Sequence, residues 1–118
     1  MSRKPERIKL VNLEEEMPTV EQARLRMQHE LQVAQKEGVR AIKLIHGYGS
    51  SGIGGALRAE LQKELRAAEH QGLIESFIAG EDWRISDPVT WELLKRFPEW
   101  KKDSDLGRTN AGISIVII

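Results

Sequence analysis

Hydrophobic and polar positions along the chain follow two periods, and each period predicts one type of element. Alternation of period two in residues 7–13, RIKLVNL, predicts a first strand. The next segment predicts a helix that begins with a capping box at Thr19 and Gln22 and ends at Gly38. Its apolar face consists of Ala23, Met27, Leu31 and Ala34.

The middle and the end of the chain predict a second helix and three further strands. Residues 39–46, VRAIKLIH, form an apolar run rich in branched side chains, which is typical of a strand buried on both faces. A helix that ends near Gly72 follows from apolar residues at helical spacing, namely Leu57, Leu61, Leu65 and Ala68. Residues 73–79, LIESFIA, and 112–118, GISIVII, predict the third and fourth strands.

This order of elements predicts the α/β class, as a two-layer α/β sandwich with both helices on one face of a mixed four-stranded sheet. Residues at about 81–108 interrupt the order and are interpreted as a helical insert. In the insert, Asp87 caps a short helix that starts at Pro88 and ends near Pro98. The prediction is therefore β-α-β-α-β, helical insert, β, within one domain of residues 1–118.

Composition narrows the classes of function. Eighteen basic and eighteen acidic side chains cancel, so a polyanion can be attracted only through a local patch. The absence of cysteine excludes disulfides and thiolate metal sites. No apolar run has the length of a transmembrane helix, and the N-terminus lacks the apolar stretch of a signal peptide. We therefore expect a cytoplasmic protein with no membrane partner.

A glycine-rich loop follows the second predicted strand, at the end where open α/β sheets bind ligands. Glycines let the backbone approach an anion, and the free N–H groups of the next helix point toward it. The spacing matches neither a Walker loop nor the G-x-G-x-x-G fingerprint. The loop is thus predicted to bind a phosphate group, but its spacing does not indicate which phosphate compound. The alternative is a flexible turn that binds no ligand.

The segment IKLIHGYG, residues 42–49, resembles the Ile-His-Gly-x-Gly signature of the Smr (small MutS-related) domain family. The ending RTNAGISIVII is similar to the closing motif of that family, and TVEQA resembles the start of its first helix. The resemblance implies a fold similar to the C-terminal domain of translation initiation factor three. It also implies nucleic-acid binding and, in several members, endonuclease or nicking activity.

The first motif of the family, Leu-Asp-Leu-His-Gly, is degenerate in this chain. Asn12 stands near the aspartate position and Glu14 near the histidine position, and two extra residues precede Thr19. Loss of these groups predicts weak or absent endonuclease activity. The triplet Glu14–Glu16 is interpreted as a solvated acidic turn rather than a metal site, because adjacent positions rarely converge on one ion. Binding is expected to need no cofactor, and a role of magnesium or manganese in cleavage stays open.

Candidate site residues come from the loop and from the resemblance. His46 is the matched candidate for catalysis, and the resemblance favours a surface position over a buried imidazole bonded to a neighbouring backbone group. Tyr48 is expected either to stack on an unpaired base or to fold back over the glycines. The predicted nucleic-acid-binding residues are His46, Gly47, Tyr48, Gly49, Ser50, Arg58, Arg108 and Asn110.

All three tryptophans, Trp83, Trp91 and Trp100, lie in the insert. Trp91 is expected to share a helical face with Leu94 and Phe97, in a cluster that anchors the insert to the rest of the fold. The alternative is an interface for a partner protein or for a second copy of the chain. Three functions therefore compete. They are binding of DNA or RNA, protein–protein interaction through the insert, and an enzyme acting on a phosphorylated small molecule.

Overall fold

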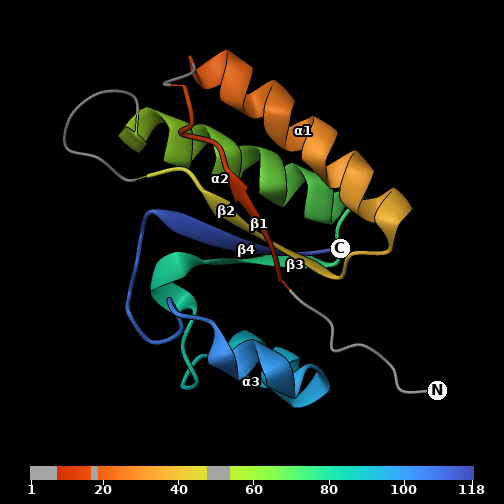
Figure 1. The fold of residues 1–118 in the computed structure, drawn as a ribbon, viewed down its shortest axis with the longest axis vertical. Helices are drawn as coiled ribbons and strands as arrows, with labels where there is room; N and C mark the ends of the chain where they lie inside the picture. Colours follow the sequence, from red (N-terminus) through yellow and green to blue (C-terminus); the bar gives the residue numbers. More distant parts are fainter. Residues whose placement is uncertain (1–7, 17–18, 48–53) are drawn as a thin grey trace.

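The computed structural model of the chain describes residues 8–16, 19–47 and 54–118, and a four-stranded sheet forms its centre (Figure 1). The strands are β1 (Ile8–Asn12), β2 (Ala41–Ile45), β3 (Ser76–Ala79) and β4 (Ile113–Ile117). Their order in the sheet is β1-β2-β4-β3. Because β1 and β2 are parallel and β4 is antiparallel to both β2 and β3, the predicted mixed sheet is confirmed.

Two helices, α1 (Val20–Glu37) and α2 (Gly54–His70), cover one face of the sheet (Figure 1). The capping box of Thr19 and Gln22 starts α1 as predicted, and Gly38 ends it in the left-handed conformation, with φ at 73°. The core of this layer includes Met27, Leu44, Leu57, Leu61, Leu65 and Val116. The predicted α/β class, with both helices on one face of a mixed four-stranded sheet, is therefore confirmed. In the described part of the chain, no helix is long and apolar enough to cross a bilayer.

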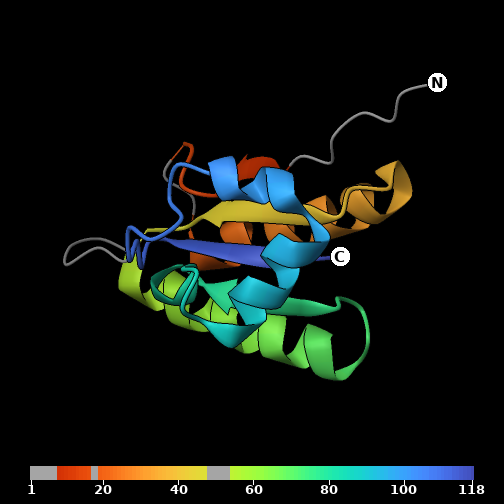
Figure 2. The same cartoon turned by 90° about the horizontal axis from the view of Figure 1, so that it is seen from below.

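The insert covers the opposite face of the sheet as a third layer (Figure 2). It contains the 3₁₀ helix η1 (Gly80–Asp82), the helix α3 (Pro88–Arg96) and the 3₁₀ helix η2 (Pro98–Lys102). Its buried side chains, which are Trp83, Leu93, Leu94, Phe97 and Trp100, pack on Ile78, Ile113, Ile115 and Ile117. The predicted anchoring cluster is thus confirmed for two of the tryptophans.

The third tryptophan, Trp91, does not share the buried face of α3. Its side chain is 42% exposed, whereas Leu94 is fully buried and Phe97 is 9% exposed. The face that packs toward the sheet is formed by Thr90, Leu93 and Leu94 instead. The expected grouping of Trp91 with Leu94 and Phe97 is wrong because the buried face turns toward Thr90, Leu93 and Leu94, which leaves Trp91 exposed.

A lysine in the middle of the central strand β2 joins the sheet to the insert. The Nζ atom of Lys43 donates to Asp103 Oδ1 at 2.9 Å and to Asp105 Oδ2 at 2.7 Å. Burial alone would lower the pKa of Lys43, but the two carboxylates outweigh it and raise the pKa above its ordinary value. The ammonium therefore stays charged inside the protein, held between the two aspartates.

Replacement of this lysine by an apolar residue should destabilise the fold strongly. We expect Lys43→Met to lower the free energy of unfolding by about 3–5 kcal/mol, because it leaves two partly buried carboxylates without their cation. Lys9→Met is the matched control, since Lys9 pairs with Glu37 at 3.0 Å on the solvent side of α1. The control should lose less than about 1 kcal/mol in urea unfolding. Equal losses in the two variants would contradict this role of Lys43.

Candidate functional site

Four chain segments meet at one edge of the sheet, on the left of Figure 1. β1, β2 and β3 all end at this edge and β4 begins there, because β4 runs against the other three. The carbonyl group of Gly112 joins the segments, since it accepts hydrogen bonds from the backbone N–H groups of His46 at 2.9 Å and Gly47 at 3.0 Å. The structure thus brings His46 and Gly47 beside the segment that leads into β4.

The side chain of His46 is fully buried at this edge. Its Nδ1 lies 2.7 Å from the carbonyl oxygen of Gly47, and its Nε2 lies 2.9 Å from the Oγ of Ser114. Because a carbonyl oxygen only accepts, Nδ1 carries the proton, and the Nε2 of a neutral ring accepts from the Ser114 hydroxyl. The expected surface position of His46 is wrong, and the buried alternative holds because both ring nitrogens have partners inside the protein.

Burial is the main influence on the protonation of His46. It lowers the pKa of the imidazole below its ordinary value, because the charged form loses its hydration. The charge of Arg58 lowers the pKa further. The contact with the Gly47 carbonyl raises the pKa but does not reverse the effect of burial. His46 is therefore a neutral group that positions the start of the loop against β4.

Glu14 lies directly against the first glycine of the loop. A Cβ atom placed on Gly47 would lie 2.8 Å from Glu14 Oε2, and the φ angle of Gly47 is +75°. Glycine is favoured here because a side chain would strain the backbone at this positive φ, and the Glu14 carboxylate would also have to move aside. The departure from the family motif at position 14 thus places a negative charge at the His46 end of the loop.

Two predicted ligands of phosphate are bound within the protein. Arg58 pairs with Glu81 at 2.7 Å, and its Nε donates to the carbonyl oxygen of Ala111 at 3.2 Å. Asn110 donates from Nδ2 to Asp105 at 3.1 Å, and its Oδ1 accepts from the N–H group of Gly112 at 2.9 Å. Both side chains hold the edge together. Arg58 is therefore bonded to Glu81 and Ala111, and its contact with a phosphate stays a prediction.

Arg108 is the predicted cation that stays exposed. It lines an open hollow of about 680 Å³ in front of β4. The other residues around the hollow are Ser104, Asp105, Thr109, Asn110 and Ala111. Three further predicted site residues, Tyr48, Gly49 and Ser50, lie outside the described residues.

Carboxylates outnumber cations where these segments meet. Glu14–Glu16 follow β1, and Glu81 and Asp82 follow β3, whereas the basic side chains of the predicted site are Arg58 and Arg108. Three of these carboxylates are already paired, Glu15 with Arg26 at 3.5 Å, Glu81 with Arg58 at 2.7 Å and Asp82 with Arg84 at 4.0 Å. In the described ranges, the acidic side chains left without an ion pair here are Glu14 and Glu16. Within the ranges that the structure describes, no group of three His, Asp or Glu residues is arranged to hold a metal ion.

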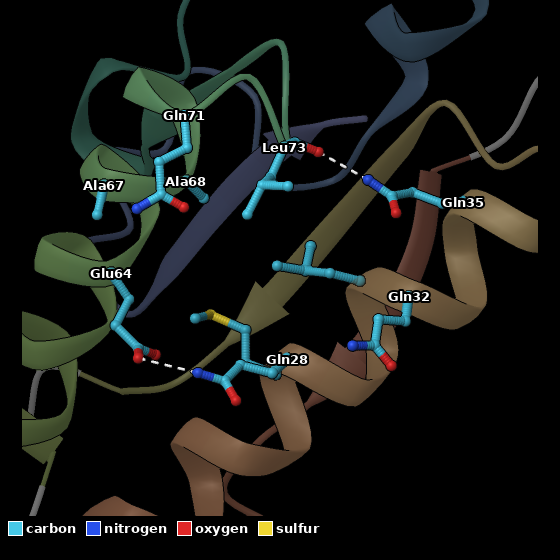
Figure 3. Close-up of a pocket in the computed structure, with 10 residues that line it drawn as sticks. Gln28, Gln32, Gln35, Glu64, Ala67, Ala68, Gln71 and Leu73 are labelled. Carbon is cyan, nitrogen blue, oxygen red and sulfur yellow. Dashed lines mark hydrogen bonds between the residues drawn. The ribbon is translucent and has the colours of Figure 1, made fainter.

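A second concave surface lies between α1 and α2, away from the His46 edge (Figure 3). This groove of about 470 Å³ has an apolar floor that includes Met27 and Leu31. Its rim carries hydrogen bonds that link the two helical segments, from Gln28 to Glu64 at 3.1 Å and from Gln35 to the carbonyl oxygen of Leu73 at 2.7 Å. The groove shares no lining residue with the predicted site.

Comparison with known proteins identifies the family. The model of the Smr domain matches residues 15–84, which is more than half of the chain. The chain belongs to the Smr domain family. Among solved structures, this Smr domain is similar to the Smr domain of Thermus thermophilus MutS2, seen in a crystal structure. The TM-score is 0.57 and the identity 24%, over 93% of this chain and 96% of that chain.

That likeness supports the fold of the Smr domain described above. A comparison with curated proteins finds no significant match. The expected similarity to the C-terminal domain of translation initiation factor three stays a prediction.

Sequence reasoning missed several residues that build this edge of the Smr domain. Ser114 is a single polar residue in the apolar run GISIVII, and that isolation is a signal of a buried hydrogen-bond partner. Gly80 allows the segment before β4 to approach, because a Cβ at this position would lie 1.8 Å from the carbonyl oxygen of Asn110. No local pattern marks Gly80, since the collision involves a segment thirty residues away.

Loss of His46 should affect stability and its pH dependence. We expect His46→Ala to lower the free energy of unfolding by about 1–3 kcal/mol at pH 8, because it leaves Ser114 and the Gly47 carbonyl without partners. In the wild type, the free energy of unfolding should fall as the pH drops below about 6.5. His46 binds a proton more readily in the unfolded chain than in the folded protein. Urea unfolding from pH 8 to pH 5 measures both effects.

The matched control for this experiment is His29→Ala, since His29 is exposed on α1. The control should keep the stability of the wild type and the same loss toward low pH. In His46→Ala the loss toward low pH should be smaller, because the group that resists the proton is gone. An NMR titration that finds the pKa of His46 above 6.5 would contradict this account.

Proposed function

We propose that this Smr domain binds structured or branched nucleic acid, DNA or RNA, at the edge where His46 and Gly47 meet the start of β4. The observation that carries the proposal is membership of the family, because Smr domains generally bind nucleic acids. The glycine at position 47 and the open hollow beside Arg108 support the choice of this edge.

Arg108 is the cation best placed to contact a phosphate in the hollow. Asp105 lines the same hollow, and its carboxylate accepts from Lys43 at 2.7 Å and from Asn110 at 3.1 Å. Lys43 is shared with Asp103, so it offsets only part of this negative charge. Arg108 forms no ion pair with any residue in the described ranges, and its side chain faces solvent. A phosphate would therefore meet one uncommitted positive charge at this position.

We infer binding without efficient cleavage. Hydrolysis of a phosphodiester needs a group that takes a proton from the nucleophile. His46 is buried, neutral and bonded at both ring nitrogens, which argues against that role. The remaining base beside the loop is Glu14, and its negative charge repels the phosphodiester that it would have to approach. Both features support weak or absent endonuclease activity.

Binding should be weak and only moderately sensitive to salt. With few basic residues at the edge, we expect contact with about two to four phosphates and a correspondingly shallow salt slope. Arg108→Ala should weaken binding to every sequence alike and reduce the salt slope by about one. Fluorescence anisotropy with labelled single-stranded, duplex and branched DNA, and with matched RNA, measures this. Arg66→Ala, which removes an exposed arginine on α2, should leave the slope unchanged.

The same substrates test the absence of efficient cleavage. Labelled branched DNA and structured RNA should remain intact on incubation with the protein, with and without magnesium or manganese. If Glu14→Gln abolishes a robust cleavage by the wild type, then the carboxylate is a base and the inferred lack of activity is wrong. No binding to any of the substrates, even at low salt, would remove the proposed function itself.

A further inference from the structure

Trp91 is the one tryptophan of the described chain that faces solvent. Trp83 is fully buried and Trp100 is 2% exposed, whereas 42% of Trp91 is exposed on the outer side of the insert. Leu93, Leu94 and Trp100 hold α3 and η2 on the sheet, and Trp91 does not belong to this buried cluster. Its large apolar surface is available to a partner.

Positive charge gathers around this tryptophan. Residues 88–102 carry four lysine or arginine side chains and two glutamates, in a chain whose net charge is zero. The Nζ atom of Lys101 lies 5.9 Å from the centroid of the Trp91 ring. The next residue, Lys102, is also exposed. The positive surplus is confined to residues 88–102, since the insert as a whole, residues 81–108, has six basic and seven acidic side chains.

Two of the four cations are committed to carboxylates and two are not. Lys95 pairs with Glu92 at 2.9 Å, and Arg96 pairs with Glu75 at 2.7 Å. Among the residues that the structure describes, Lys101 and Lys102 have no carboxylate within ion-pair distance. We define Trp91, Lys101 and Lys102 as the Trp91 platform.

The backbone that carries the Trp91 platform is held firmly. Asp87 caps α3 by accepting from the N–H group of Thr90 at 3.0 Å. The rings of Phe97 and Trp100 stack at 4.2 Å, with 15° between their planes, at the junction of α3 and η2. Because the backbone of this site is already rigid, a ligand does not have to order it on binding.

We propose that the Trp91 platform binds a single-stranded segment of nucleic acid. An unpaired base stacks on the face of the Trp91 indole that Lys101 does not cover, and the flanking phosphates lie at Lys101 and Lys102. The inference rests on the proposed function and adds a second contact on the opposite face of the sheet from α1 and α2. Charge favours nucleic acid, because a lysine over the exposed ring and a second exposed lysine next to it in the chain suit a polyanion whose bases have aromatic faces.

The test compares variants in their binding to a labelled oligothymidylate and to a duplex of the same length. Trp91→Ala should weaken binding of the single strand by about 5- to 100-fold, and Trp91→Phe should restore most of it. The double variant Lys101→Ala/Lys102→Ala should reduce the salt slope by about 1.4, since about 0.7 is expected for each phosphate of a single strand. Binding of the duplex should change less, because its bases are already stacked.

Matched controls separate the platform from general effects of charge and folding. Lys36→Ala/Lys63→Ala removes two exposed lysines from α1 and α2 and should leave the single-strand affinity within about twofold. The melting temperatures of the lysine variants should stay close to that of the wild type, because the replaced side chains face solvent. Trp91 is 42% exposed, so Trp91→Ala removes some packing, and its melting curve checks that it is folded.

Three other outcomes would contradict the inference, and one of them would also contradict the proposed function. If the wild type binds the single strand and Trp91→Ala binds equally well, the inference is overturned while the proposed function stands. If the wild type binds no nucleic acid, the proposed function and the inference fail together. If sedimentation shows a dimer that Trp91→Ala dissociates while single-strand binding is unchanged, the Trp91 platform is an interface between copies of the chain and the inference is wrong.

Discussion

The buried ammonium of Lys43 is the contact on which both proposed binding surfaces depend. It lies on the central strand β2 and holds Asp103 and Asp105 of the insert. Asp103 also accepts from the indole N–H of Trp83 at 3.0 Å. From Asp105 the chain of bonds continues through Asn110 to Gly112, whose carbonyl binds the first residues of the glycine loop. One charge therefore fixes the insert and the His46 edge together, and it does so in a region where an unpaired carboxylate would be costly.

Local signals in the sequence predicted the local structure well, and they failed where distant segments decide. The capping box at Thr19, the cap at Gly38 and the start of α3 after Asp87 depend on neighbouring residues, and all three are present. The burial of His46 depends on Ser114, and the place of Glu14 depends on Gly47, so neither could be deduced from spacing. Trp91 shows the same limit, because a helical period cannot tell which side of α3 meets the sheet.

The third layer explains why β4 is buried on both faces. All five residues of β4 are buried, although a two-layer sandwich would leave alternate side chains in water. Ile113, Ile115 and Ile117 pack on the insert, whereas Val116 packs on the helices. The insert is therefore part of the core rather than an appendage. The strand pattern GISIVII already contained this information, since a run without polar alternation predicts cover on both sides.

The two proposed binding surfaces differ in their charged and aromatic side chains. The edge around His46 offers a close approach at Gly47 but surrounds it with carboxylates, which limits the number of phosphates that it can hold. The insert offers the exposed part of the Trp91 ring, Lys101 over that ring, and the exposed Lys102. A partner that is single-stranded in one part and structured in another would satisfy both surfaces, because each contributes what the other lacks. Two weak contacts on one rigid body then combine, since binding at the first raises the effective concentration at the second.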